Sequence, residues 1–330
     1  MNLNFRVKQK QGVFLKFFYW SVCFFCMFPL AFAGESRLSS HKAMFGEAEF
    51  IGNISNKKID EASGMAASHL QNDLLWVNND SGDDAVIYAL SKDGKGMGQV
   101  HLASAKNIDW EDMASFEWKN TAYLLIADTG DNKGKRKNCT LYIIEEPVVT
   151  AHGLFPKSVH LRWQINFQYE DGPRDCEAVT VDVATEQCLL LSKRDDFPQL
   201  YTLPLSPPPG QGIVTAKKIA RIATIPRPNP EDLIQPYGRN RSQPTAMDIT
   251  PNGQCLVILT YKHAYLYSKK NHQTWASCFT ADPGIIQLPL VGLGSLIQRE
   301  AMCLSLDGQW LYLTSEKLPA PLYRLEIILN

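Results

Sequence analysis

A repeat of five segments constrains the fold of this chain more than any other feature of its sequence. The segments align without gaps on five anchor residues, which are Ser63, Glu111, Glu177, Thr245 and Glu300. Two residues before each anchor the chain has an acid or an amide, and two residues after it the chain is apolar. An apolar run, such as residues 74–77 or 256–259, surrounds the position twelve residues after each anchor. Columns that recur at fixed offsets predict a repeat protein.

Each repeat contains short β-rich runs separated by turn signals, such as Pro251-Asn252-Gly253 and Asp307-Gly308. The anchors are 48 to 68 residues apart, which is enough chain for one four-stranded blade of a β-propeller. We therefore predict an all-β propeller with five blades. A sixth blade within residues 206–240 is the alternative, but the proline clusters of that stretch favour a loop.

The predicted ring needs a strand from the N-terminal side of the repeats. The fifth repeat reaches Asn330 without an outer strand, and an open ring would leave unpaired strand edges. Residues 49–54 precede the first repeat and have the composition of a strand, so we expect them to close the ring. Residues 34–330 are accordingly predicted to form a single propeller domain.

Residues 1–33 are typical of a signal peptide. Four basic residues between Arg6 and Lys16 precede the apolar run 17–30, and Ala31-Phe32-Ala33 supplies small residues for cleavage. The run is shorter than the roughly 20 apolar residues of a membrane-spanning helix. We therefore expect cleavage near Gly34 and export to the periplasm or the medium, with no stable membrane anchor afterwards.

Charge and cysteine content agree with an exported enzyme or binding protein. The chain has 33 Lys and Arg against 34 Asp and Glu, a balance that argues against a nucleic-acid partner. Six cysteines follow the predicted signal peptide: Cys139, Cys176, Cys188, Cys255, Cys278 and Cys303. An even number in an oxidising compartment predicts up to three disulfide bonds, with buried free thiols as the alternative.

The anchor residues are predicted to ligate a metal ion at the hub of the ring. Three of them are glutamates, which would repel one another unless a positive charge lies between them. Carboxylate and hydroxyl oxygens without histidine or cysteine favour calcium over zinc or copper. In the alternative interpretation, the glutamates bind backbone amides and hold no ion.

A second set of charged residues follows the predicted second strands and should surround the same mouth of the propeller. Its acidic members, the candidate catalytic residues, are Asp80, Asp83, Asp128 and Asp131. Its basic members, the candidate ligands of an anionic substrate, are Lys193, Arg194, Lys262 and Lys317. The simpler interpretations are turn formation by Asp and Gly and ordinary solvated surface charge.

Several of these motifs resemble known families. The segments 76–83, 109–112, 128–132, 175–178 and 300–301 together resemble a family of exported bacterial β-propeller proteins that brings no established function with it. The order hydroxyl, Glu, Glu, hydroxyl, Glu among the anchors is similar to the calcium ring of the five-bladed calcium-dependent apyrases, with Thr245 in place of a serine. This second resemblance implies a central calcium ion and hydrolysis of nucleoside phosphates.

The leading functional hypothesis is therefore a calcium-dependent hydrolase of a phosphorylated or otherwise anionic small molecule. A non-catalytic binding or scaffold propeller, in which calcium only makes the ring rigid, is the alternative. Hydrolysis of a sugar or lactone is a third class, which needs the metal but no basic residues at the mouth. The fold alone does not choose among these functions.

Overall fold

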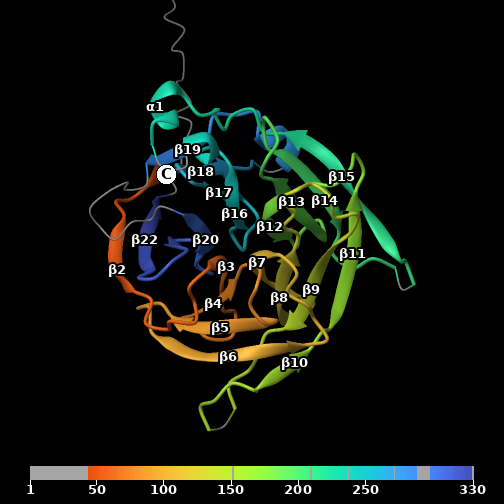
Figure 1. Ribbon diagram of the computed structural model, residues 1–330, viewed down its shortest axis with the longest axis vertical. Coiled ribbons are helices and arrows are strands. Elements are labelled where there is room, and N and C mark those ends of the chain that lie inside the picture. The colour runs from red at the N-terminus through yellow and green to blue at the C-terminus, as the bar shows by residue number, and fades with distance from the viewer. Residues whose placement is uncertain are drawn as a thin grey trace, which may run out of the picture. The chain divides into compact units, whose positions relative to one another are not determined.

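The computed structural model describes residues 44–150, 152–208, 210–235, 238–270, 272–287 and 298–328 (Figure 1). These residues belong to one compact unit, His41–Asn330. The predicted signal peptide lies outside the described residues.

The strands form four hydrogen-bonded sheets within the described residues. The first contains β3 (Ala62–Ala67), β4 (Leu74–Asn79), β5 (Val86–Ser91) and β6 (Gly96–Ala103), and β10 (Ser158–His160) pairs in parallel with β6. The second comprises β7 (Trp110–Trp118), β8 (Thr121–Asp128), β9 (Cys139–Glu145), β11 (Trp163–Tyr169), β12 (Cys176–Asp182), β13 (Gln187–Ser192), β14 (Gln199–Pro204) and β15 (Ile213–Arg221). Parallel pairing of β11 with β15 joins the two halves of this eight-stranded sheet.

The remaining two sheets complete the ring. One contains β16 (Pro244–Ile249), β17 (Cys255–Thr260), β18 (His263–Ser268) and β19 (Gly284–Gln287). The other contains β20 (Arg299–Leu304), β21 (Trp310–Ser315) and β22 (Pro321–Ile328), and both β1 (Met44–Phe45) and β2 (Glu49–Asn53) pair with β22. The strand expected at residues 49–54 is therefore present, at the edge where the ring needed it.

The innermost strands β3, β7, β12, β16 and β20 contact one another in cyclic order, and β20 contacts β3. In Figure 1 they surround the centre, whereas β2, β6, β11 and β15 lie at the outside. This arrangement is a β-propeller, as the repeat predicted. Hydrophobic clusters fill the spaces between successive sets of strands. The second strands read as apolar runs because they are packed on both faces; β4, for example, is buried along its whole length.

The described helices are short. They are α1 (Pro230–Leu233), the 3₁₀ helix η1 (Gly238–Asn240) and α2 (Trp275–Cys278). Thr274 accepts a hydrogen bond from the backbone amide of Ser277 and begins α2, and the outer strand β19 follows this helix. None of the described helices has both the length and the apolar character needed to cross a membrane.

The cysteines follow the alternative interpretation. All six that lie in the described residues are free and buried, so the predicted disulfides are not found. Cys139, Cys176 and Cys188 pack within one hydrophobic cluster as small apolar side chains. Burial raises the pKa of the Cys139 and Cys176 thiols to about 12, which keeps both groups protonated.

Closure of the ring by β2 makes a testable prediction. A chain that begins at Ser55 loses the pairing of β2 with β22, and we expect its free energy of unfolding to fall by about 3 kcal/mol or more. Urea unfolding followed by circular dichroism measures this change. The matched control begins at Met44 and keeps both strands. Equal unfolding midpoints for the two truncated chains would show that the ring closes without β2.

Candidate functional site at the hub

Each anchor residue lies at an irregularity near the start of an innermost strand. The pairing of that strand with the second strand shifts register across every anchor, between Ala62/Gly64, Trp110/Met113, Cys176/Ala178, Pro244/Ala246 and Arg299/Met302. Such a bulge changes the direction of a side chain without ending the strand. The repeat therefore encodes a recurrent β-bulge, and the anchors mark it.

Three anchors line a polar cavity of about 170 Å³, which we call the hub cavity. Its lining consists of Asp80, Glu111, Asn132, Glu177, Lys193, Arg194, Asn240, Tyr261, Gln298, Glu300 and Glu316. Five of these residues carry carboxyl groups and two carry basic groups. The cavity is thus built to hold charged or strongly polar groups.

Lys193 supplies a positive charge among the anchors. Its Nζ forms an ion pair with Glu177, lies 3.0 Å from the hydroxyl of Tyr261 and is 4.0 Å from Glu300 Oε2. Tyr261 in turn donates a hydrogen bond to Glu300. Burial alone would lower the pKa of Lys193, but the carboxylates of Glu300 and Glu177 raise it well above its usual value. Part of the charge that we assigned to a metal ion is therefore supplied by a side chain.

On the other side of the cavity, fewer basic side chains balance the negative charge of the carboxylates. Single oxygens of Asp80, Asp109 and Glu111 lie within 4.8 Å of one another, and we call these residues the carboxylate cluster. Burial is the main cause that raises the pKa of all three: to about 6 for Asp109, and well above its usual range for Glu111. The clustered carboxyl groups therefore favour a proton or another cation over mutual repulsion.

Gly130 allows this cluster to form. A Cβ at this position would overlap both Glu111 Oε1 and the carboxylate of Asp109. The backbone N–H of Gly130 also donates to the carbonyl of Asp109 at 3.1 Å. The glycine in the predicted Asp-Thr-Gly-Asp turn therefore makes room for two acidic side chains.

A second acidic group, Glu111, Asp175 and Glu177, also has its oxygens within 4.8 Å. Arg194 forms an ion pair with Asp175, which also accepts the backbone N–H of Asp131 at 2.8 Å. Lys193 also pairs with Glu177, so two of the three carboxylates in this second group already have a basic partner.

The two hydroxyl anchors bind protein atoms. Ser63 Oγ donates to Glu111 Oε2 at 3.0 Å, so it orients a member of the carboxylate cluster. Thr245 Oγ1 donates to the carbonyl of Arg299 at 2.7 Å and is fully buried. The Thr245 hydroxyl is therefore directed to a backbone carbonyl, a contact that the alternative interpretation, which concerned the glutamates, did not include.

Of the candidate catalytic residues, only Asp80 lines the hub cavity. Asp83 accepts hydrogen bonds from Asn79 at 3.0 Å and Tyr88 at 2.7 Å. Asp128 pairs with Arg136 at 2.7 Å, and Asp131 accepts the backbone N–H groups of Lys135 at 2.9 Å and Arg136 at 2.7 Å. These contacts give the three residues a role in shaping the loops around the cavity.

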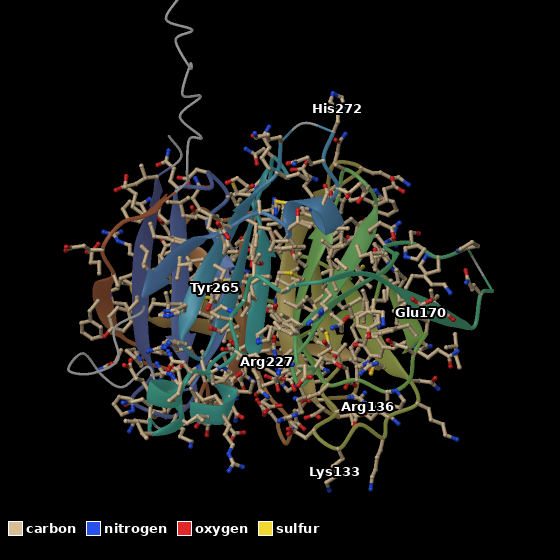
Figure 2. All side chains as sticks on the ribbon, turned by 90° about the horizontal axis from the view of Figure 1, so that it is seen from above. Lys133, Arg136, Glu170, Arg227, Tyr265 and His272 are labelled. Carbon is tan, nitrogen blue, oxygen red and sulfur yellow. The ribbon has the colours of Figure 1, made fainter. Side chains whose placement is uncertain are left out.

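The basic candidates separate in the same way. Lys193 and Arg194 line the hub cavity, whereas Lys262 pairs with Asp232 beside α1 at 2.8 Å and Lys317 is exposed. Lys193 and Arg194 also line an adjoining pocket of about 200 Å³ that contains Arg227 and Arg239, which we call the arginine pocket. Figure 2 shows Arg136 and Arg227 on one side of the ring and His272 on the other.

Sequence reasoning missed several residues of the site. Tyr261 and Glu316 lie sixteen residues after their anchors, in the same column as Lys193. The predicted site residues Asp80, Arg194, Lys262 and Lys317 come from the next column, seventeen residues after each anchor. The column at sixteen was visible in the alignment and would have identified both residues.

No protein-family model matches the chain, and no curated protein matches it. Among solved structures it is similar to the PQQ-bound aldose sugar dehydrogenase of Streptomyces coelicolor, with 12% identity, a TM-score of 0.43, and coverage of 87% of this chain and 99% of that chain. It is also similar to a luciferin-regenerating enzyme, with 9% identity, a TM-score of 0.45, and coverage of 85% and 95%. It is similar as well to the hydrazine synthase of Kuenenia stuttgartiensis, with 11% identity, a TM-score of 0.40, and coverage of 82% of this chain and 71% of that chain. Similarity this remote carries no argument about the chemistry of this chain.

The role of Lys193 can be tested by a double-mutant cycle with Glu177. Lys193→Met leaves Glu177 buried without its partner, so we expect a loss of about 3–5 kcal/mol in the free energy of unfolding at neutral pH. Adding Glu177→Gln should recover part of that loss, because the unpaired charge is removed. Additive effects of the two substitutions would mean that the ion pair does not stabilise the hub.

Proposed function

We propose that this chain is an exported five-bladed β-propeller that binds a divalent cation at the hub and hydrolyses a small anionic molecule. The observation that carries the proposal is the hub cavity, where five carboxyl side chains meet only two basic ones. An adjoining arginine pocket gives the substrate's anionic group a place next to the cation.

The blade count rests on the repeat and on the five innermost strands. Each of these strands carries one anchor at a bulge, and together they make a cycle of contacts. The eight-stranded sheet counts as two blades, because it contains two innermost strands, β7 and β12, and is joined only by its outer strands β11 and β15. Residues 206–240, where a sixth blade was the alternative, contain one strand, β15, together with α1 and η1 among their described residues.

Export rests on residues 1–33 alone, which have the basic, apolar and small-residue regions of a signal peptide. Periplasmic or extracellular calcium would then be available to the protein. Amino-terminal sequencing of the exported protein should find a start near Gly34.

The carboxylate cluster fits a divalent cation. It offers three carboxylates with oxygens close together, and Gly130 leaves the space between Glu111 and Asp109 clear of side-chain atoms. Beside it, the buried Asp128 Oδ2 has no hydrogen-bond partner among the described residues. Oxygen-only donors favour calcium, but of the five anchors predicted to ligate it only Glu111 belongs to this cluster. Such a cation, when bound, supplies Lewis acidity to a phosphoryl or carbonyl oxygen.

The chain's own residues would bind the substrate and deliver a proton. Arg194, Arg227 and Arg239 would hold the anionic group in the arginine pocket. Burial, with Glu300 as the second cause, raises the pKa of Glu316 to about 8. Glu316 is therefore protonated at neutral pH and is placed in the cavity as a general acid, oriented by Gln298 Nε2 at 2.5 Å.

A non-catalytic binding propeller is the second candidate. The ion pair between Lys193 and Glu177 favours it, because that pair already neutralises part of the hub without any substrate. In this case the cation would stabilise the ring, and turnover would be absent.

The cation prediction concerns affinity. Calcium at one hundred times its dissociation constant should raise the free energy of unfolding by about 2.7 kcal/mol. We expect Asp109→Asn, Glu111→Gln and Gly130→Ala each to weaken calcium binding at least tenfold in isothermal titration calorimetry. Asp84→Asn is the matched control, since this exposed aspartate lies in the same loop as Asp80 but outside the cluster. Unchanged affinity in the three cluster variants would place the ion elsewhere.

The catalytic prediction concerns turnover. In a hydrolysis screen of phosphate esters, nucleotides and lactones with calcium, Glu316→Gln should lower kcat at least tenfold with little change in KM. Arg239→Ala should chiefly raise KM, because it removes part of the anion's binding site. Calcium binding without hydrolysis of any of these compounds would select the binding propeller.

A further inference from the structure

A further cavity lies at the end of the ring away from the hub cavity. It measures about 320 Å³, and we call it the distal cavity. It is lined where the innermost strands end: by Ser115–Glu117 of β7, Val181–Asp182 of β12, Asp248–Ile249 of β16 and Leu304 of β20. The anchors lie near the beginnings of these strands. Six residues of a strand span roughly 20 Å, so the two cavities are separate sites.

The walls of the distal cavity combine apolar and polar side chains, in contrast to the wholly polar hub cavity. Phe116, Val181, Ile249, Leu304 and Leu306 contribute to them. A cavity with apolar walls and a few polar groups is the usual form of a small-molecule site. Its size suits a ligand with one small aromatic or aliphatic group.

The charged groups of this cavity are acidic. Asp182, Asp248 and Glu117 line it, and its one other titratable group is His69, whose pKa is lowered by burial so that the imidazole is neutral. Lysine and arginine are absent from the described lining. The lining therefore places acidic groups beside apolar side chains, although Lys269 pairs with Asp182 from outside the lining and burial raises the pKa of Asp248 to about 7.

One of these carboxylates has an oxygen without a hydrogen-bond partner in the described part of the chain. Asp182 is 2% exposed; its Oδ2 accepts the indole N–H of Trp275 at 3.1 Å, and Lys269 lies 3.7 Å from the same oxygen. Its other oxygen, Oδ1, is buried and has no hydrogen-bond partner among the described residues. Asp248 accepts the backbone N–H groups of Ile249 and Leu304, both at 2.8 Å, and the hydroxyl of Thr180 at 3.5 Å, and these contacts hold its carboxyl group at the cavity.

We propose that the distal cavity binds a small primary or secondary amine that carries a hydrophobic group. The ammonium group would bind the carboxylates of Asp248 and Asp182, and the hydrophobic group would pack against Phe116 and Leu304. A buried carboxylate with an unpaired oxygen gains most from a charged donor, and the apolar walls exclude water from the contact. This site is independent of the proposed cation and of the proposed hydrolysis.

The test uses 2-phenylethylamine as the probe and isothermal titration calorimetry on the full mature chain. We expect a dissociation constant below about 1 mM and binding at least tenfold tighter than for 2-phenylethanol, which has the same shape without the charge. Phenylacetate should not bind, because its charge is opposite. An amine that binds no more tightly than the alcohol would overturn the proposal.

Two variants locate the binding. Asp248→Asn should weaken amine binding at least tenfold, and Ala184→Trp should do so by filling the mouth from an exposed turn, where folding is not at risk. Thr185→Trp is the matched control, because this exposed neighbour does not line the cavity. Asp80→Asn at the hub should leave amine binding unchanged. Equal amine affinity in Ala184→Trp and Thr185→Trp would overturn the proposal even if Asp248→Asn failed to fold.

Discussion

The ion pair between Lys193 and Glu177 is the interaction on which the hub of this propeller depends. Five innermost strands begin around one axis, and three of them carry a glutamate at the bulge where they begin. Lys193 lies between Glu177 and Glu300, and Tyr261 links the lysine to Glu300. The ammonium group thereby compensates the negative charge on one side of the cavity and leaves the carboxylate cluster on the other side, where we propose that an external cation binds.

Between the two cavities the ring is held by a different carboxylate. Asp112 is fully buried next to Glu111 and accepts backbone N–H groups from Met113, Val179 and Met247 at 2.9, 2.9 and 3.0 Å. These amides belong to β7, β12 and β16, so one side chain joins three innermost strands. The strands consequently keep a fixed spacing, and their two ends can serve different chemistry: charged at the hub cavity, and apolar with few acids at the distal cavity.

The class of fold and the convergence of the anchors could be predicted from the sequence, because both follow from columns at fixed spacing. The residues that complete the hub could not be placed as well. Asp80 and Arg194 line the cavity, whereas Lys262 of the same column does not, so the column alone does not decide which side chains reach the hub. Lys262 instead pairs with Asp232 of α1, a helix that has no counterpart in the repeats. The distal cavity has no sequence signal, since its walls are ordinary core residues.

The cysteines are a second case in which the sequence did not predict the structure. Their even number permitted disulfides, but their number says nothing about their neighbours. Cys176 and Cys188 each lie in a strand whose interior positions are packed on both sides, and both are buried among apolar side chains. The spatial neighbours of each cysteine, which the sequence does not give, therefore determine that these thiols are free and buried.

The central claim is that Lys193 and an external cation divide the hub between them. Anomalous diffraction at a long wavelength, from crystals of the mature protein grown with calcium, locates the ion directly. The account predicts one strong peak bounded by Asp80, Asp109 and Glu111, with Lys193 still paired to Glu177. A peak between Glu177 and Glu300 with Lys193 displaced, or no peak at the hub, would contradict it.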